Sequence, residues 1–287
     1  MKTAYKTIRF HQKSYNQIVL CNRIIEDYQN QGLRLTLRQL YYQLVTRNEI
    51  TNEEKSYSHL SGLVSNARLT GLMDWEAIED RTRQPKRPNE FSNLKNLVEA
   101  AIWSYRLPRW EGQEYYAELW VEKDALAGVL SPLASEFHVT MMVNRGYSSQ
   151  SAMSESAQRF NDHPDQIPIL FYLGDHDPSG EDMVRDIQDR LVMFGVDEIE
   201  VVKIALTMDQ INQYRPPPNP AKMKDPRSKK YVDQHGYSSW EVDALPPEVL
   251  SDIIRSAFEQ IVDEEKMDVI KQKENEDKAR MRSLYNQ

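Results

Sequence analysis

The sequence has a single cysteine, Cys21, and no long run of apolar residues. One cysteine excludes an internal disulfide and a cysteine-rich zinc site, and it is typical of proteins of the reducing cytosol. No apolar window approaches the roughly 18 residues that a membrane-spanning helix needs. Residues 1–10 are mixed and polar, without the apolar core of a signal peptide. We therefore expect a cytoplasmic globular protein that makes no contact with a membrane.

The chain also has fewer basic than acidic residues, with 36 Lys and Arg against 44 Asp and Glu and a formal net charge of −8. The charge is unevenly distributed. Residues 1–110 hold 17 Lys and Arg against 11 Asp and Glu, a net of +6, and residues 111–287 hold 19 against 33, a net of −14. The first part is basic enough to contact phosphates, and the second is acidic. This distribution permits DNA binding but does not by itself indicate it.

The first 90 residues show apolar residues at helical intervals, separated by short polar connections. We predict helices over residues 5–30, Leu37–Arg47 and Tyr57–Leu72, with a short turn or the start of a β wing at Trp75–Ile78. Three helices in about 80 residues are typical of a helix-turn-helix or winged-helix module, although other helical bundles share this outline. The prediction for residues 1–90 is a helical, winged-helix-like domain.

The pattern changes after residues 91–113, which we interpret as a linker with a helix at Ser92–Tyr105. Residues 114–287 alternate between strands and helices, which indicates a mostly parallel sheet with helices on both faces. The predicted fold class of the chain is therefore α/β. The predicted strands are Ala117–Val121, His138–Val143, Ile169–Leu173 and Ile199–Ile204. The predicted helices of this part are Asp124–Glu136, Ser149–Asn161, Glu181–Phe194 and Pro247–Lys273.

Acidic residues follow two of the predicted strands. Glu122 comes after the first, and Asp175 and Asp177 lie in a glycine turn after the third, with His176 between them as a spacer. Because sites in parallel sheets form beyond the carboxyl ends of the strands, we expect the three acids to converge. Such close carboxylates need a cation, and Mg²⁺ prefers carboxylate oxygens completed by water and phosphate. We interpret the trio as a Mg²⁺ site, the alternative being that these acids only cap helices.

A second acidic group precedes the last predicted helix. Glu241 and Asp243 are candidates to complete the metal shell, and the alternative for Asp243 is an N-cap. Basic residues supply candidate DNA contacts in three places, with a flexible surface loop as the alternative for the last of them. These residues are Arg81, Arg83, Lys86 and Arg87 in a proline-broken segment, Arg145 after the second strand, and Lys222 and Lys224 in the loop Arg215–Lys230.

The predicted helix Leu37–Arg47 contains two adjacent tyrosines. Tyr41 lies on the apolar stripe of this helix and is expected in the core. Tyr42 lies about 100° away around the helix, and Arg38 shares its face one turn earlier. A tyrosine beside a guanidinium is a candidate nucleophile toward a phosphodiester, because the cation favours the phenolate. The alternatives are an ordinary surface tyrosine at 42 and an Arg38 that holds a phosphate oxygen.

The acidic trio resembles that of the Toprim domain of topoisomerases, primases and related nucleases, which binds Mg²⁺. Arg38 and the Tyr41–Tyr42 pair, followed by a Toprim-like domain, resemble the A subunit of topoisomerase VI and the related meiotic protein that breaks both DNA strands. The resemblance covers about residues 30–260. It implies a winged-helix domain followed by a Rossmann-like Toprim domain, with Tyr42 as nucleophile and Arg38 beside it. Arg145 and its neighbours resemble a Lys-Gly-Tyr segment of the family.

The chain resembles the minimal, stand-alone A-subunit-like proteins of bacteria, phages and mobile elements, related to topoisomerase VIII, more than it resembles typical A subunits. The resemblance implies a Mg²⁺-dependent enzyme that cleaves double-stranded DNA as a homodimer, through a 5′-phosphotyrosyl bond. Each site would combine the tyrosine of one protomer with the acids of the other. Nothing in the chain resembles the ATPase of the B subunit, so a full strand-passage cycle would need a B-type ATPase subunit in trans. Two alternatives stay open: a Toprim nuclease that uses water as nucleophile, and a DNA-binding regulator without catalysis.

Overall fold

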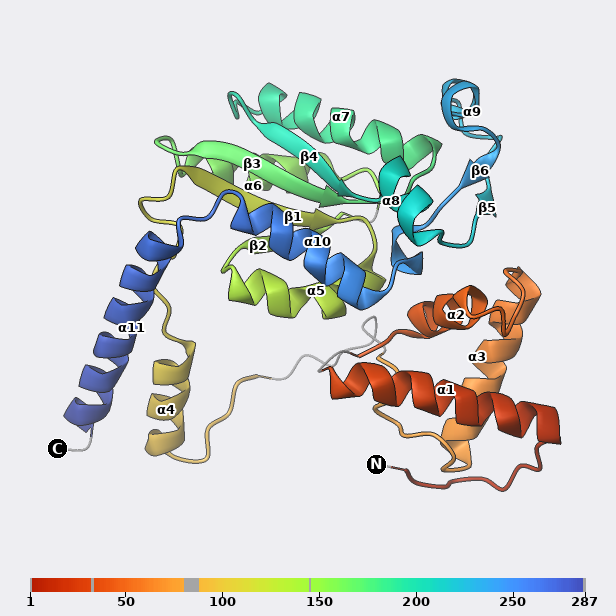
Figure 1. Ribbon diagram of the computed structural model, residues 1–287. Helices are drawn as coiled ribbons and strands as arrows, with labels where there is room; N and C mark the ends of the chain where they lie inside the picture. Colours follow the sequence, from red (N-terminus) through yellow and green to blue (C-terminus); the bar gives the residue numbers. More distant parts are fainter. Residues whose placement is uncertain (1, 32–33, 80–87, 145, 286–287) are drawn as a thin grey trace.

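The computed structural model describes residues 2–31, 34–79, 88–144 and 146–285. It shows a helical unit followed by a parallel sheet with helices between its strands (Figure 1). The predicted α/β class, with a helical first part and a Rossmann-like second part, is confirmed. Among the described helices, none is both long and apolar enough to cross a membrane.

Three helices form the amino-terminal unit: α1 (Gln12–Asn30), α2 (Leu37–Thr46) and α3 (Glu54–Leu69). The α2 helix begins at Thr36, whose hydroxyl accepts the N–H of Gln39, while the Gln39 side chain accepts the N–H of Thr36. This reciprocal capping box satisfies two backbone donors that the helix itself leaves unpaired. The apolar faces of the three helices share one core, so the first prediction, a three-helix module, matches the structure.

The first predicted helix is shorter than expected. Residues 2–11 are not helical, and the backbone N–H groups of Tyr5 and Lys6 donate to the Leu69 carbonyl at 2.8 and 3.0 Å. The pattern of residues 5–30 gave no sign of this contact, which joins the start of the chain to the end of α3. The periodicity of this segment therefore overestimated the helix by about two turns.

Within its described residues, this unit has β structure only in the form of single-residue bridges. They join Ala4 to Thr70 in the antiparallel sense and Leu35 to Ile78 in the parallel sense. A turn is present at Trp75, as predicted, but the described residues add no β hairpin that would make a wing. The unit is therefore a three-helix module in its described part.

The sheet has four parallel strands in the order β2-β1-β3-β4. Their bounds are Tyr115–Val121 for β1, Thr140–Val143 for β2, Ile167–Leu173 for β3 and Glu200–Ala205 for β4. Side chains alternate between the two faces: Leu119 packs with the core on the α5 and α10 side, and Trp120 with the core on the α6 and α7 side. The covering helices are α5 (Asp124–Glu136), α6 (Gln150–Asn161), α7 (Pro178–Met193) and α10 (Pro247–Glu259).

The region after β4 is more ordered than the predicted loop Arg215–Lys230. A two-stranded antiparallel pair and a helix lie beyond the carboxyl edge of the sheet (Figure 1). The loop prediction was wrong in part, because this segment contains β5 and the start of α9. The elements are α8 (Met208–Tyr214), β5 (Asn219–Pro220), α9 (Ser228–His235), β6 (Ser238–Ser239) and the 3-10 turn η1 (Val242–Ala244).

The single helix predicted at Pro247–Lys273 is two helices, α10 and α11 (Glu264–Tyr285). The break lies at Asp263, where the side-chain amide of Gln113 donates to the backbone carbonyl at 2.9 Å and accepts the backbone N–H at 2.8 Å. Gln113 is buried and distant in sequence, so this clamp could not be seen in the periodicity of residues 247–273. A tertiary contact therefore divides a continuous helical pattern.

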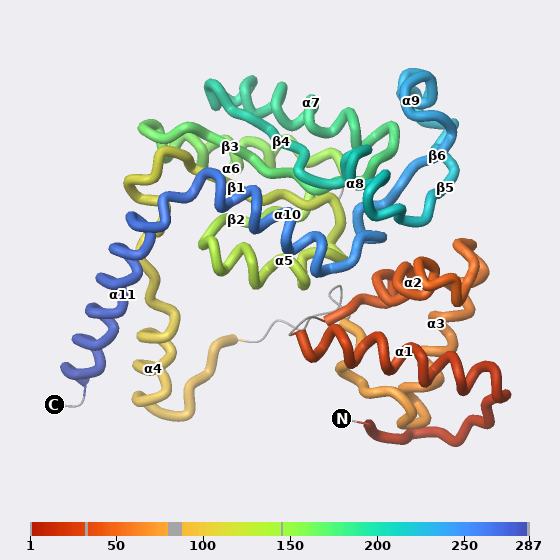
Figure 2. Tube along the Cα trace, viewed as in Figure 1, coloured from red at the N-terminus to blue at the C-terminus, as the bar shows by residue number. Residues whose placement is uncertain are grey.

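The α11 helix packs beside α4 (Leu94–Ser104), and the two extend together away from the sheet (Figure 2). Their junction contains the buried carboxylate of Glu274, 3 % exposed as a side chain. Arg109 and Lys278 donate to it at 3.2 and 2.5 Å, and the backbone N–H of Leu107 donates at 3.1 Å. This carboxylate therefore joins the last helix to the chain that leads into β1.

Glu274→Gln should lower the free energy of unfolding by about 3 kcal/mol at pH 7, because it leaves buried cations without their counter-charge. Burial alone would raise the pKa of Glu274, but hydrogen bonds from Lys278, Leu107 and Arg109 hold the pKa at about 2. Since this folded-state pKa lies below the ordinary value of 4.5, the stabilisation is complete above that pH and is lost as the pH falls toward about 2. Thermal unfolding of both proteins between pH 7 and pH 2.5 measures the effect.

The control is Glu265→Gln, an exposed position of the same helix, which should change stability by less than about 0.5 kcal/mol. A deficit in Glu274→Gln that stayed constant across the pH range would show that the charge of Glu274 contributes nothing.

Candidate functional site

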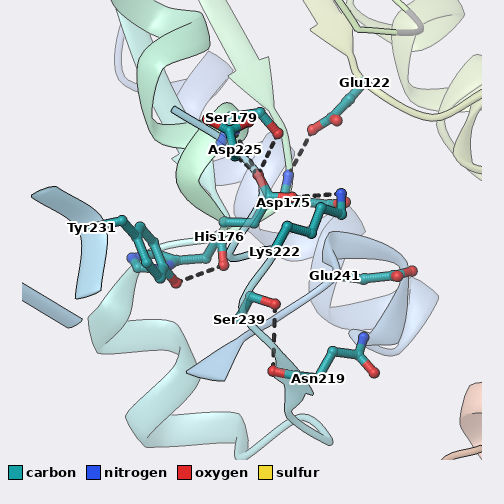
Figure 3. Close-up of polar contacts among 12 residues, drawn as sticks. Glu122, Asp175, His176, Ser179, Asn219, Lys222, Asp225, Tyr231, Ser239 and Glu241 are labelled. Atoms are coloured by element: carbon teal, nitrogen blue, oxygen red, sulfur yellow. Dashed lines mark hydrogen bonds and ion pairs between the residues drawn. The ribbon is translucent and has the colours of Figure 1, made fainter. Parts of the chain in front are cut away.

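The acids Glu122 and Asp175 lie side by side at the carboxyl ends of neighbouring strands. The parallel register aligns Val121 of β1 with Leu173 of β3, so the residues that follow each strand leave the sheet at the same edge. The Glu122 carboxylate accepts the backbone N–H of Asp175 at 2.9 Å (Figure 3). The structure thus brings together the two segments that the strand pattern predicted to meet.

Asp177 begins the next helix and is 3 % exposed. One carboxylate oxygen accepts the N–H groups of Ser179 and Gly180 at 3.0 and 2.7 Å, and the other contacts the Lys222 ammonium at 2.9 Å. Burial alone would raise the pKa of Asp177, but the hydrogen bonds from Lys222 and from the helix start outweigh it and lower the pKa. Asp177 is therefore ionised and is an N-cap as well as a candidate ligand.

Position 180 requires glycine because a side chain would not fit there, and not because of its backbone dihedral angles. A Cβ at this position would collide with the backbone carbonyl of Asp175, which accepts a hydrogen bond from Lys203 at 2.7 Å. Gly180 lies within the first turn of α7. The helix start and the acidic turn are therefore packed directly against each other.

The Tyr172 hydroxyl lies beneath the acids and is completely buried. Its ring packs against Gly174, where a Cβ would lie 2.5 Å from the ring edge. Burial, followed by the charges of Glu122, Asp175 and Asp177, raises the pKa of Tyr172, so the phenol is neutral. This hydroxyl has no hydrogen-bond partner among the described residues. Buried polar atoms normally have a hydrogen-bond partner. Within the described chain, the Tyr172 hydroxyl is therefore an unpaired hydrogen-bond donor beside the acids.

Asp175 also belongs to a second cluster, centred on the ammonium group of Lys123. This group contacts the carboxylates of Asp175, Glu241 and Asp243 at 2.9, 2.8 and 3.0 Å. The Asp175 oxygen also accepts the backbone N–H of Val242 at 2.9 Å. Burial raises the pKa of Asp175, and Lys123 opposes this effect. The predicted additional ligands Glu241 and Asp243 are thus bound to a lysine, and Asp243 does not cap a helix through its side chain.

The helical unit contributes Arg38 to the outer side of this cluster. Its guanidinium pairs with Glu241 and lies 2.9 Å from the Asp243 carboxylate. Burial alone would raise the pKa of Glu241, but the cations of Lys123 and Arg38 hold it well below its usual range. An ion-paired network therefore joins α2 to the turn before α10.

Tyr42 lies against this network, with the Arg38 guanidinium 5.7 Å from the centre of its ring. Contrary to the prediction, it is buried like Tyr41, at 4 % exposure. Burial and the carboxylates of Asp243 and Glu241 raise the pKa of Tyr42, and Arg38 only partly opposes them. Arg38 favours the phenolate, as expected, but burial and the carboxylates that pair with Arg38 outweigh its effect on the phenol.

The donor set of Glu122, Asp175 and Asp177 fits Mg²⁺, which prefers oxygen ligands. No group of three or more His, Cys, Asp or Glu side chains in the described chain is already arranged around a common metal position. Mg²⁺ uses one or two carboxylates and completes its shell with water and phosphate, so a pair suffices. Two lysines, Lys123 and Lys222, show that these carboxylates attract cations.

Of the basic residues predicted to contact DNA, the structure describes Lys222 and Lys224. Lys222 reaches the acids, and Lys224 is exposed nearby in the same segment. The candidates Arg81, Arg83, Lys86, Arg87 and Arg145 lie outside the described residues.

His176 faces away from the acids, as its interpretation as a spacer required. Its ring nitrogen Nδ1 lies 2.8 Å from the Tyr231 hydroxyl, in α9. Burial lowers the pKa of His176, so the ring is neutral. The two backbone hydrogen bonds between His176 and Trp240 attach the acidic turn to the segment that contains Glu241.

The fold and the site together define an α/β protein with an acidic site at the carboxyl edge of its parallel sheet. No model of a known protein family matches the chain, and no curated protein matches its sequence. Sequence reasoning missed Lys123 and Tyr172. Lys123 follows Glu122 directly, and a basic residue beside a candidate ligand was the available signal; Tyr172 stands inside an apolar strand and gave none.

Gly180→Ala should destabilise the protein by about 1–3 kcal/mol, because the new methyl group displaces the Asp175 carbonyl. Binding of Mn²⁺, used as a probe for Mg²⁺, should weaken with it because Asp175 moves. Thermal unfolding and Mn²⁺ titration measure the two effects.

Gly62→Ala is the matched control, since a Cβ there meets nothing within 4 Å. Because position 62 is exposed inside α3, this substitution should raise the free energy of unfolding by about 0.5–1 kcal/mol. Equal effects of the two substitutions would contradict the steric role of Gly180.

Proposed function

We propose that this protein is a Mg²⁺-dependent enzyme that cleaves double-stranded DNA, as the A subunits of type IIB topoisomerases do. The observation that carries the proposal is the meeting of Glu122 with Asp175 and Asp177 at one sheet edge, with Arg38 and Tyr42 docked against the neighbouring turn that contains Glu241 and Asp243. Acids at this edge of a parallel sheet occupy the usual position of an active site. The Toprim resemblance of the sequence supports the same function.

In the proposed reaction, the Tyr42 oxygen attacks a backbone phosphorus, the bond to the 3′ oxygen breaks, and a 5′-phosphotyrosyl link forms. Glu122, Asp175 and Asp177 would hold Mg²⁺, which when bound stabilises charge on the phosphate and the leaving oxygen. Tyr42 gives up its proton as it attacks, and the 3′ oxygen takes one as it leaves. Because the link retains the phosphodiester energy, religation needs no further cofactor.

The docked tyrosine has to move before it can attack. Its burial and raised pKa keep the phenol neutral and out of contact with solvent. Separation of α2 from the turn at Glu241 would free both Arg38 and Tyr42. A homodimer, in which the freed tyrosine reaches the acids of the partner subunit, accounts for two breaks in a duplex.

The basic first part of the chain and the lysines Lys222 and Lys224 are the proposed DNA contacts. Arg81, Arg83, Lys86, Arg87 and Arg145 are proposed for the same role. A complete strand-passage cycle would require an ATPase subunit in trans. The proposed location is the bacterial cytoplasm, at the nucleoid.

A hydrolytic nuclease is the second candidate, and the burial of Tyr42 is the observation in its favour. In this reaction a water molecule held at the acids attacks the phosphorus and gives up a proton, one P–O bond of the backbone breaks, and the leaving oxygen takes a proton. Tyr42 stays docked. The same metal site would serve both reactions, so the nucleophile alone separates them. A regulator that binds DNA without cleaving it is the remaining outcome.

Tyr42→Phe should abolish covalent attachment of protein to DNA, because the substitution removes the attacking oxygen. The measurement incubates the protein with supercoiled plasmid and Mg²⁺, quenches with detergent and detects linear DNA with protein on its 5′ ends. We expect a loss of at least about 10³-fold, as is usual for removal of a nucleophile.

Tyr41→Phe is the control, since Tyr41 is the adjacent buried tyrosine and its hydroxyl donates to Asn52 at 3.0 Å. It should cost about 1 kcal/mol of stability and keep the adduct. Cleavage that survives Tyr42→Phe without an adduct would establish the nuclease. If folded wild-type protein cuts no DNA, with or without a partner ATPase, the result would favour a regulator that binds DNA without cleaving it.

A further inference from the structure

Two lysines contact the acids at the sheet edge, and they do so in different ways. The Lys123 side chain is 19 % exposed and contacts three carboxylates, whereas the Lys222 side chain is 68 % exposed and contacts Asp177 alone. An exposed ion pair contributes little and is readily exchanged, but a buried cation among several carboxylates is costly to remove. The two ammonium groups are therefore not equivalent competitors for a metal ion.

We propose that Lys123 is a built-in cation that fills the second cation position of the site, so that each chain binds one divalent metal ion and not two. The proposal rests on the metal site of the proposed function and specifies how many ions that site takes. The single ion would bind at the acids of the proposed metal site, Glu122, Asp175 and Asp177, by displacing Lys222 from Asp177. Lys123 is a positioning residue in this arrangement, because it acts through Asp175, Glu241 and Asp243.

The arrangement of the acids supports this assignment. Many phosphodiester-cleaving sites hold two metal ions about 3.5–4 Å apart. Asp175 lies between the two halves of this site: its backbone N–H contacts Glu122, and its carboxylate contacts the Lys123 ammonium. A second ion would need Asp175, Glu241 and Asp243, and these are the three carboxylates that surround Lys123.

The carboxylates around Lys123, which form the second half of the site, are already paired with cations. Lys123 and Arg38 supply two positive charges against the three carboxylates of Asp175, Glu241 and Asp243. A divalent ion would have to remove an ammonium group that is tethered to the chain directly after β1. In the other half, Lys222 is the cation that contacts Asp177, and its exposure allows it to move into solvent.

Titration of the full-length chain with Mn²⁺ alone, followed by electron paramagnetic resonance and calorimetry, counts the bound ions. We expect one Mn²⁺ per chain in the wild type and two in Lys123→Met, which vacates the second position while keeping most of the side-chain volume. Lys123→Arg keeps the charge and should stay at one. The matched variant Lys222→Met should also stay at one, with binding about 3- to 5-fold tighter because a competing surface ion pair is gone.

Two Mn²⁺ ions in the wild type would overturn the role of Lys123 while leaving the proposed metal site intact. One ion in a folded Lys123→Met, or in Lys123→Gln if the methionine variant does not fold, would also overturn it. No bound Mn²⁺ in the wild type, Lys222→Met or Lys123→Met would instead remove the metal site itself, and with it the proposed function.

Discussion

The group of ion pairs around Lys123 is the interaction on which the arrangement of this molecule depends. It joins the ends of β1 and β3 to the turn before α10, and through Arg38 it also binds the helical unit. Buried charges are stable only when each is compensated, so the loss of one partner would leave the others without theirs. Because Ala244 lies in the core of the helical unit, apolar packing supports the same contact.

This network also sets the chemistry available to Tyr42. Burial, and then the carboxylates that hold Arg38, raise the pKa of the phenol, so the contact that fixes α2 keeps its tyrosine neutral and buried. In the proposed reaction, Tyr42 in this state would be inactive, and its activation would depend on separation of the two units. The same charges would thus couple the position of the helical unit to the reactivity of this tyrosine in the proposed reaction.

The sequence predicted the strands and the convergence of Glu122 with Asp175 because both follow from local pattern and from a general property of parallel sheets. The N-cap role of Asp177 was the alternative considered, and the structure shows that this carboxylate caps α7 while it stays available to a cation. Boundaries failed where a distant side chain decided them. The clamp of Gln113 on Asp263 is one such case, since periodicity reports only on neighbours along the chain.

By itself the sequence determined the fold class, the order of the strands along the chain and the edge at which the acids meet, because apolar periodicity specifies which faces are buried. The tertiary structure alone decided which cation each carboxylate holds and where Tyr42 lies. Ion pairing depends on distances between segments far apart in sequence, as between Arg38 and Asp243. Burial of a helix face likewise depends on what packs against it, so a tyrosine off the apolar stripe of α2 became part of the interior.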